Sequence, residues 1–318
     1  MKAPDATVVI PTRDRCRRLE LAVRSALAQT GVDLEVLIID DGSTDATGQM
    51  ASSIPDPRVR YLKRVVSEGV SAARNVGIAE ARGRWIAFLD DDDVWAPTKL
   101  ARQIGVMESD ERTWSYAGDV MVDGDLNILS GGPPLPPDEV VSLLERYDSI
   151  PAGASNVVVR ADALAAAGPF DTGLTSSEDW DMWIRLARQG PPDWVRSPLV
   201  AISHHRDNAS RDTAAMIRQL DVVARRYGIR VDRARHHRWA AWYALLDGRR
   251  ADATRSYARA VAAGDIGSLA RATVAILAPG YALRRARPKA VERDRWIAEA
   301  SAWLDALKDQ RVGPCGDA

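Results

Sequence analysis

Four consecutive aspartates, Asp90 to Asp93, stand directly after an apolar run in the segment IAFLDDDDVW. Carboxylates packed this closely repel one another, so they need water or a cation beside them. Two further aspartates, Asp40 and Asp41, follow another apolar run, LEVLII. Hard divalent cations prefer carboxylate oxygens as ligands. The pattern therefore indicates a Mg²⁺ or Mn²⁺ site that meets a phosphorylated ligand. Solvated turns are the alternative, and they explain Asp40 and Asp41 better than the four-aspartate run.

The elements that must position these aspartates alternate between strand and helix. Short apolar runs predict strands at residues 7–11, 34–39, 59–62 and 85–89, and apolar spacing or position predicts helices at 17–29 and 70–82. This alternation favours a parallel sheet with helices on both faces. Ligands bind such sheets at the carboxyl ends of the strands, which is where the aspartates stand.

The later part of the chain divides near residue 210. Before it, the patterns predict a helix at 97–108 opened by Pro97, strands at 114–122, 156–160 and 194–202, a helix at 178–189 and a Pro/Gly-rich loop at 131–138. After it, strand signals disappear, and residues 236–264 predict two helices joined at Asp247 and Gly248, similar to one tetratricopeptide-type unit. We expect an α/β domain over residues 1–210 and an α-helical region over 211–318.

The overall composition is that of an ordinary soluble protein. The 43 Lys and Arg residues nearly balance the 44 Asp and Glu residues, so we expect no nucleic-acid partner. The N-terminal residues lack the apolar core of a signal peptide, and no run approaches a membrane span. We therefore expect a cytoplasmic protein in which Cys16 and Cys315 are reduced thiols.

Five ordered blocks of the sequence resemble family 2 glycosyltransferases. The blocks are VVIPTRDR (8–15), SALAQT (25–30), LEVLIIDDGSTDAT (34–47), EGVSAARNVGIAEARGRWIAFLDDDDVWAPTKL (68–100) and SSEDWDMWIRLARQG (176–190). The resemblance covers residues 7–210 and implies the GT-A nucleotide-diphospho-sugar transferase fold, with a Rossmann-like mixed sheet. It also implies metal-dependent, inverting transfer of a sugar from a nucleotide-diphosphate donor to a hydroxyl acceptor. The Q-x-x-R-W motif of the processive members is absent, so we expect transfer of a single sugar.

The resemblance also assigns the donor site. It implies that the nucleotide is bound by Pro11, Thr12, Arg13, Asp40, Asp41, Gly69, Arg74 and Asp90, with Asp41 on the base and Asp40 supporting it. Asp90 and Asp92 would form the D-x-D pair of metal residues, with Asp90 nearer the ribose and Asp92 holding Mn²⁺ or Mg²⁺ beside the diphosphate. His205 is implied as a further metal ligand, but His204 is an equal chemical candidate. UDP is the family's commonest carrier, while dTDP and GDP stay open, and the acceptor belongs to a glycan, a lipid-linked intermediate or a small molecule.

The segment SSEDWDMW carries the implied catalytic residues. Asp179 would be the general base, and Glu178 would orient Asp179 or the acceptor. A structural alternative exists, because Ser176 and Asp179 have the spacing of a capping box. Trp180 and Trp183 would form a platform for the acceptor sugar, although their spacing is more often that of core residues.

Other classes of protein are less well supported. An NAD-linked oxidoreductase would need G-x-G-x-x-G after the first strand, and none is present there. A haloacid-dehalogenase-type phosphatase would use Asp90 as nucleophile and Asp92 as acid, but its motif ordinarily follows the first strand of the domain. A non-catalytic nucleotide-binding module of the same fold would not need Asp179. Residues 271–295 join an apolar segment to a basic cluster, which indicates either peripheral membrane contact or a docking or homodimer surface.

Overall fold

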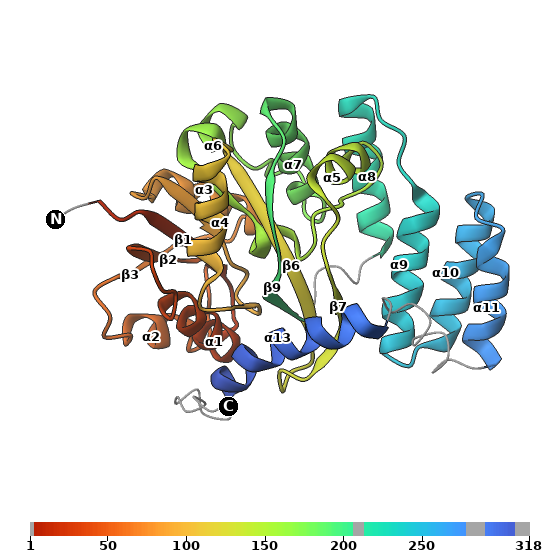
Figure 1. Ribbon diagram of the computed structural model, residues 1–318, viewed down its shortest axis with the longest axis horizontal. Helices are drawn as coiled ribbons and strands as arrows, with labels where there is room; N and C mark the ends of the chain where they lie inside the picture. Colours follow the sequence, from red (N-terminus) through yellow and green to blue (C-terminus); the bar gives the residue numbers. More distant parts are fainter. Residues whose placement is uncertain (1–2, 206–212, 278–289, 309–318) are drawn as a thin grey trace.

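The computed structural model describes residues 3–205, 213–277 and 290–308. A nine-stranded sheet forms its centre, in the order β3-β2-β1-β4-β8-β6-β9-β5, with β7 paired to β6 (Figure 1). The strands are β1 (Ala6–Thr12), β2 (Leu34–Asp40), β3 (Val59–Lys63), β4 (Trp85–Phe88), β5 (Val94–Trp95), β6 (Trp114–Val122), β7 (Ile128–Gly132), β8 (Val158–Arg160) and β9 (Asp193–Ser203). The helices are α1 (Cys16–Leu27), α2 (Thr47–Ser52), α3 (Val70–Glu80), α4 (Lys99–Ser109), α5 (Pro137–Leu144), η1 (Gly153–Asn156), α6 (Ala161–Ala167), α7 (Glu178–Gln189), α8 (Thr213–Tyr227), α9 (Arg233–Leu246), α10 (Arg250–Ala262), α11 (Gly267–Leu277) and α13 (Ala290–Lys308).

Strands β1 to β4 form the parallel part that the sequence predicts. β1 pairs in parallel with β2 and β4, and β2 pairs in parallel with β3. Every residue of β1, β2 and β4 is buried, because helices cover both faces of the sheet. Val8 and Ile10 pack with α1 and α4 on one face, whereas Val9 packs with α3 and α7 on the other. The carboxyl ends of β1 and β2 lie together, with Thr12 opposite Asp40.

The rest of the sheet is mixed, as the resemblance implied. β8 runs antiparallel to β4 and β6, and β6 runs parallel to β9. Two local expectations are wrong. Helix α4 begins at Lys99 after Thr98, so Pro97 lies before the helix and does not open it. Helix α5 begins inside the predicted Pro/Gly loop, because Pro137 is tolerated at the first helical position and Asp138 and Glu139 favour the first turn.

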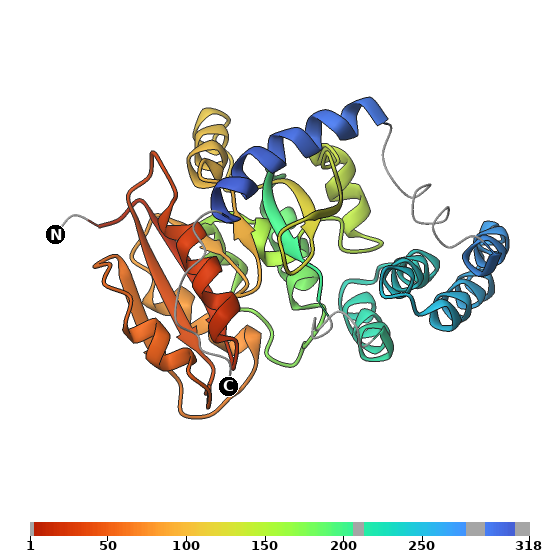
Figure 2. The ribbon, with the colours of Figure 1, turned by 90° about the horizontal axis from the view of Figure 1, so that it is seen from below.

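The helical region stands at one end of the molecule. Helices α9 and α10 form the predicted hairpin, and α11 packs against α10 (Figure 1). Helix α13 instead returns to the sheet and lies against β7 and β9 (Figure 2). There the indole nitrogen of Trp296 donates a hydrogen bond of 3.0 Å to the carbonyl of Asp119. A division near residue 210 therefore stays a proposal, and α13 belongs by its contacts to the sheet.

The expectation that Cys16 is a reduced thiol is wrong. Cys16, the first residue of α1, is disulfide-bonded in the structure, so it is not a reduced thiol. Cys315 lies outside the described residues.

Helix α3 lies unusually close to β1 because of one glycine. A Cβ atom at Gly77 would lie 2.2 Å from Cγ1 of Val9, nearer than two carbon atoms can approach. The same helix carries Arg74, which points toward the carboxyl ends of β1 and β4 and contacts Asp90. The missing side chain at Gly77 therefore allows the close approach of α3, the helix that carries Arg74, to β1.

We predict that Gly77→Ala lowers the free energy of unfolding by about 1–3 kcal/mol, because the added methyl group overpacks the contact with Val9. Urea denaturation measures this change. Gly105→Ala is the matched control: Gly105 is exposed on α4 with nothing near its Cβ position, so alanine there should be neutral or stabilising by up to about 1 kcal/mol. Equal effects of the two substitutions would contradict the close contact between α3 and β1.

Candidate active site

The first pair of aspartates shapes the turn after β2. Asp40 is fully buried, and its carboxylate accepts hydrogen bonds from the backbone N–H of Ser43 (2.7 Å) and the hydroxyl of Tyr61 (2.5 Å). Burial and this carboxylate raise the pKa of Tyr61. Asp40 thus holds the turn that presents Asp41.

Asp41 ties the loop after β3 to the end of β2. Its carboxylate accepts hydrogen bonds from Ser67 Oγ (2.7 Å) and from the backbone N–H groups of Glu68 (3.2 Å) and Gly69 (2.8 Å), and it pairs with Arg64. Gly69 has φ of +90°, a conformation that favours glycine. A nucleobase that bonds Asp41 must therefore share its carboxylate with these donors or displace one of them.

The segment after β1 lies between this loop and the four aspartates. Pro11 is buried in β1, whereas Arg13 is exposed and donates to Ser67 Oγ at 2.9 Å. Thr12 turns the other way, and its hydroxyl donates to Asp91 Oδ2 at 2.6 Å. The structure therefore brings the predicted nucleotide residues to one edge of the sheet.

Arg15 neutralises the middle of the four-aspartate run. Its Nη1 lies 3.1 Å from Asp91 Oδ1 and 2.7 Å from Asp92 Oδ2. Burial, together with the charge of Asp92, raises the pKa of Asp91 to about 7. Asp91 thus has two defined side-chain partners, Thr12 and Arg15.

Asp92 contacts a histidine as well as Arg15. His205 Nε2 is 2.7 Å from Asp92 Oδ2 and 3.1 Å from Arg18 Nη1. Burial alone would raise the pKa of Asp92, but the hydrogen bond with His205 and the charge of Arg15 lower it. The structure therefore places His205 beside Asp92.

The chemistry of these donors fits a divalent cation. Among the described residues, no three His, Cys, Asp or Glu side chains gather as a ready metal cage. Asp92 and His205 nevertheless offer one carboxylate and one imidazole at the same point. Mg²⁺ and related ions commonly take one or two protein ligands and complete their shell with phosphate and water. A phosphate-bound cation therefore fits better here than a cation held by protein alone.

Asp93, the last of the four aspartates, bonds two other segments of the chain. Its carboxylate accepts hydrogen bonds from Ser155 Oγ (2.6 Å) and from the backbone N–H of Ser203 (3.0 Å). Ser155 Oγ in turn accepts the N–H of Asp90 at 3.0 Å. Burial and the charges of Asp92 and Asp90 raise the pKa of Asp93 well above its usual value. Asp93 therefore joins the aspartate run to η1 and β9.

Arg74 is the hub of the site. Its buried guanidinium donates to Asp90 Oδ1 (2.7 Å), Asp179 Oδ1 (2.7 Å) and Glu178 Oε1 (3.2 Å). Burial would lower the pKa of Arg74, but the three carboxylates raise it above its usual value. One cation thus joins the end of β4 to the start of α7.

Asp179 is placed by hydrogen bonds on both of its carboxylate oxygens. Oδ2 accepts the backbone N–H of Ala154 at 3.1 Å, while Oδ1 faces Arg74. Burial raises the pKa of Asp179, and the charge of Arg74 opposes that rise. Burial and the charge of Asp179 also raise the pKa of Glu178 to about 7, and Glu178 Oε2 has no hydrogen-bond partner among the described residues.

Two purely structural roles are possible for the segment SSEDWDMW: a capping box and core tryptophans. The structure lacks the first and has the second. The residue before α7 is Ser177, and no side chain caps the helix, so the capping box of Ser176 with Asp179 does not form. Trp180 and Trp183 are fully buried, and the Trp183 ring stacks on Trp114 at 6.3 Å. A sugar platform at Trp180 and Trp183 is therefore wrong, and both belong to the core.

Several residues of the site have no counterpart in the sequence prediction. Arg15, Arg18 and Ser155 contact the predicted carboxylates or histidine, and the N–H of Ala154 contacts the predicted base. Arg15 had a signal, because it follows the first strand within the same RDR segment as Arg13. Ser155 and Ala154 had none, since η1 is a single short turn.

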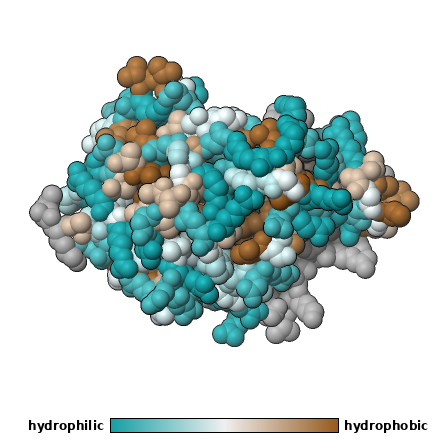
Figure 3. Space-filling model, turned by 90° about the horizontal axis from the view of Figure 1, so that it is seen from above, coloured by the Kyte–Doolittle hydropathy of each residue, from teal (hydrophilic) through white to brown (hydrophobic). Residues whose placement is uncertain are grey.

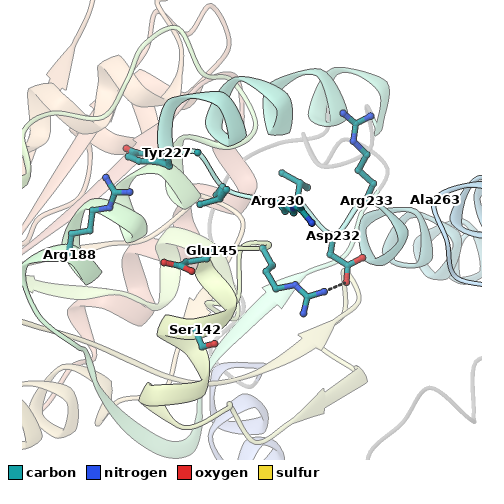
Figure 4. A pocket seen from close by; sticks show the side chains of 12 residues that line it. Ser142, Glu145, Arg188, Tyr227, Arg230, Asp232, Arg233 and Ala263 are labelled. Atoms are coloured by element: carbon teal, nitrogen blue, oxygen red, sulfur yellow. Dashed lines mark ion pairs between the residues drawn. The ribbon is translucent and has the colours of Figure 1, made fainter.

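A cavity of about 810 Å³ lies outside this cluster, where α5, α7 and the start of α9 meet (Figure 4). Arginines line much of it, and the guanidinium of Arg188 lies 4.6 Å from the centre of the Tyr227 ring. Asp232 pairs there with Arg146 at 4.0 Å. None of the predicted site residues lines this cavity.

Known proteins resemble this chain in sequence. The model of the family described as glycosyl transferase family 2 matches residues 7–127. A UDP-Glc:alpha-D-GlcNAc-diphosphoundecaprenol beta-1,3-glucosyltransferase, WfaP of Escherichia coli, is 30% identical over 220 residues, 68% of this chain and 82% of that protein. The succinoglycan biosynthesis protein ExoO of Rhizobium meliloti is 43% identical over 129 residues, 41% of this chain. That alignment covers 35% of ExoO, so the chain matches about a third of that relative's length.

Solved structures share the fold. TarS of S. aureus in complex with UDP-GlcNAc has a TM-score of 0.55 and 15% identity, covering 95% of this chain and 92% of that one. The mannosyltransferase PcManGT of Pyrobaculum calidifontis, in complex with GDP-Man and Mn²⁺, has a TM-score of 0.52 and 18% identity, covering 98% and 87%. At these identities the likeness establishes the GT-A fold alone.

We predict that Glu178→Gln flattens the pH dependence of stability. The folded state holds a proton on Glu178 up to a pKa of about 7, whereas the unfolded chain releases it near 4.5. This contribution to stability is therefore complete below pH 4.5 and is lost as the pH rises through 7. Melting temperatures of the wild type and of the variant from pH 4.5 to 8 should diverge, with the wild type falling more steeply. Parallel curves would show that Glu178 is already ionised at low pH.

Proposed function

The chain belongs to glycosyl transferase family 2 and is a glycosyltransferase, and we propose that it moves one sugar from a UDP-sugar to a hydroxyl acceptor with inversion. One observation carries this proposal. A single guanidinium, that of Arg74, bonds both Asp90 on the proposed donor side and Asp179 on the proposed acceptor side. Inverting transfer needs donor and base in one fixed arrangement, because the hydroxyl attacks the sugar opposite the leaving group.

The donor lies across the ends of β1, β2 and β4 in this proposal. Asp41 and its loop take the nucleobase, Arg13 lies beside the nucleotide, and Asp90 faces the ribose. Asp92 and His205 would hold a divalent cation, Mn²⁺ or Mg²⁺, whose positive charge would offset the charge of the departing nucleoside diphosphate. The hydrogen bond between Asp92 and His205 supports this placement.

Asp179 is the general base in this proposal. Its Oδ1 bonds Arg74 and its Oδ2 bonds the N–H of Ala154, so the carboxylate has little freedom to rotate. The positive charge of Arg74 favours the ionised form, which can take the acceptor's proton. Arg74 therefore acts through Asp179 as a positioning residue, and it also orients Asp90.

The class of acceptor is proposed from the name of a relative and from an exposed apolar surface on the helical region. WfaP is named for a diphosphoundecaprenol-linked acceptor, which makes a lipid-linked acceptor the favoured class here. Ile266, Leu269 and Leu277 project apolar side chains from the edge of α11, where the surface is hydrophobic (Figure 3). Such a face suits peripheral contact with the inner surface of a membrane. No helix in the described part of the chain is long and apolar enough to cross a bilayer.

The competing functions differ in what they require. Membership of the glycosyltransferase family removes the haloacid-dehalogenase-type phosphatase. A nucleotide-binding module without catalysis would bind donor but would not depend on Asp179. The ordered carboxylate of Asp179 favours the enzyme over that module.

We predict that Asp92→Ala abolishes the Mn²⁺-dependent stabilisation by UDP, because the substitution removes the carboxylate beside His205. A bound ligand at a hundredfold excess over its Kd stabilises a protein by about 2.7 kcal/mol, which a thermal shift resolves. Asp305→Ala is the matched control, since Asp305 is an exposed aspartate on α13. An Asp92→Ala protein with the full Mn²⁺-dependent shift would sink the metal assignment.

We predict that Asp179→Asn lowers sugar transfer by about 100-fold or more while UDP binding survives, because asparagine keeps the shape but cannot accept the proton. Transfer is followed as UDP release in the presence of acceptor, and binding as a thermal shift. Unchanged turnover per folded molecule would remove Asp179 as the base. UDP binding without turnover in the wild type itself would favour the non-catalytic module.

A further inference from the structure

Helix α9 lays one face against the catalytic domain. Near its start, the His236 ring lies 6.4 Å from the ring of Trp180. Near its end, the Tyr243 ring lies 5.4 Å from the ring of His204. Residues seven apart on a helix share a face, so this face spans the two contacts.

Trp239 lies between these contacts. It follows His236 by three residues and precedes Tyr243 by four, which places all three on the same face. Its ring centre lies 4.4 Å from that of Tyr243. Unlike Trp180 and Trp183, the Trp239 side chain is only partly buried, so part of its ring is accessible to a ligand.

The two contacts also locate Trp239 relative to the catalytic cluster. Trp180 directly follows Asp179, the proposed base. His204 directly precedes His205, which bonds Asp92. Helix α9, which carries Trp239, therefore packs beside both the segment that holds the proposed base and the segment that holds the proposed metal ligand His205.

The Tyr243 ring contacts both Trp239 and His204, and one polar atom of His204 lacks a partner. His204 is nine-tenths buried, and its Nε2 bonds Asp247 Oδ1 at 3.1 Å. Its other ring nitrogen, Nδ1, has no hydrogen-bond partner among the described residues. A buried polar atom without a partner is costly, and a ligand hydroxyl would satisfy it.

We propose that Trp239, with His204, forms a subsite that binds a pyranose ring of the acceptor, an inference that rests on the proposed function. An indole offers a large, flat, rigid surface at little conformational cost. The apolar C–H face of a pyranose stacks on such a surface, while its hydroxyl groups bond to His204. The acceptor class is therefore a saccharide, and α9 supplies the specificity.

Saturation-transfer NMR tests the subsite with defined probes. Methyl glycosides of glucose, galactose, mannose and N-acetylglucosamine are titrated into the full chain with UDP and Mn²⁺. We expect the wild type to bind at least one glycoside, Trp239→Ala to bind it at least tenfold more weakly, and Trp239→Tyr to restore most of the affinity. The matched control is Trp303→Ala, because Trp303 is a partly buried tryptophan on α13 that bonds Pro198 on the other side of the sheet.

The outcomes separate the subsite from the proposed function. Equal glycoside affinity in the wild type and Trp239→Ala overturns the subsite, as does a wild type that binds UDP but none of the four glycosides. Loss of glycoside binding in both Trp239→Ala and Trp303→Ala overturns it too, because the loss is then not specific to α9. Glycoside binding that needs Trp239, in a chain that binds no nucleotide sugar, supports the subsite and overturns the glycosyltransferase mechanism.

Discussion

The buried guanidinium of Arg74 is the constraint on which the rest of the site depends. A cation removed from water is costly unless it is paired, and Arg74 meets three carboxylates from two separate segments, Asp90 after β4 and the Glu178–Asp179 pair at the start of α7. Each carboxylate needs the same cation, because its neighbours repel it. One shared charge on α3 thus ties the start of α7 to the end of β4, so it also ties the proposed donor side to the proposed acceptor side.

A second cluster, in which positive side chains again pair with carboxylates, lies beside the first. Arg15 pairs with Asp91 and Asp92, and His205 joins Asp92 to Arg18. The two clusters take three of the four aspartates, and Asp93 is held by Ser155 and the N–H of Ser203, so each carboxylate of the run has a donor. A diphosphate adds negative charge to this balance, whereas a divalent cation adds positive charge. The proposed donor and cation would therefore suit this charge balance better together than either would alone.

The sequence predicts the parts of this molecule whose cause is local. Fully buried strands such as β1 and β2 can be recognised in the sequence as apolar runs. The helix predicted at residues 178–189 begins where α7 begins, at Glu178. The sequence also predicts that the aspartates gather, because parallel strands end at one edge. It cannot predict which strands β8 pairs with or which carboxylates Arg15 contacts, since these depend on which distant segments meet. The tryptophans show the limit most clearly: spacing could not decide between Trp183 in the core and a partly exposed Trp239.

Helix α13 has a consequence for the order in which the molecule can be built. Trp296 fits over Gly118 of β6, and Ala300, Leu304 and Leu307 cover Val120 and Val122. A ribosome makes β6 long before it makes these residues, so this sheet face stays uncovered by α13 through the synthesis of the helices from α5 to α11. The nascent chain must therefore keep an apolar sheet face from other molecules until residue 307 has emerged. Dependence on chaperones during synthesis would then follow from the position of one helix in the sequence.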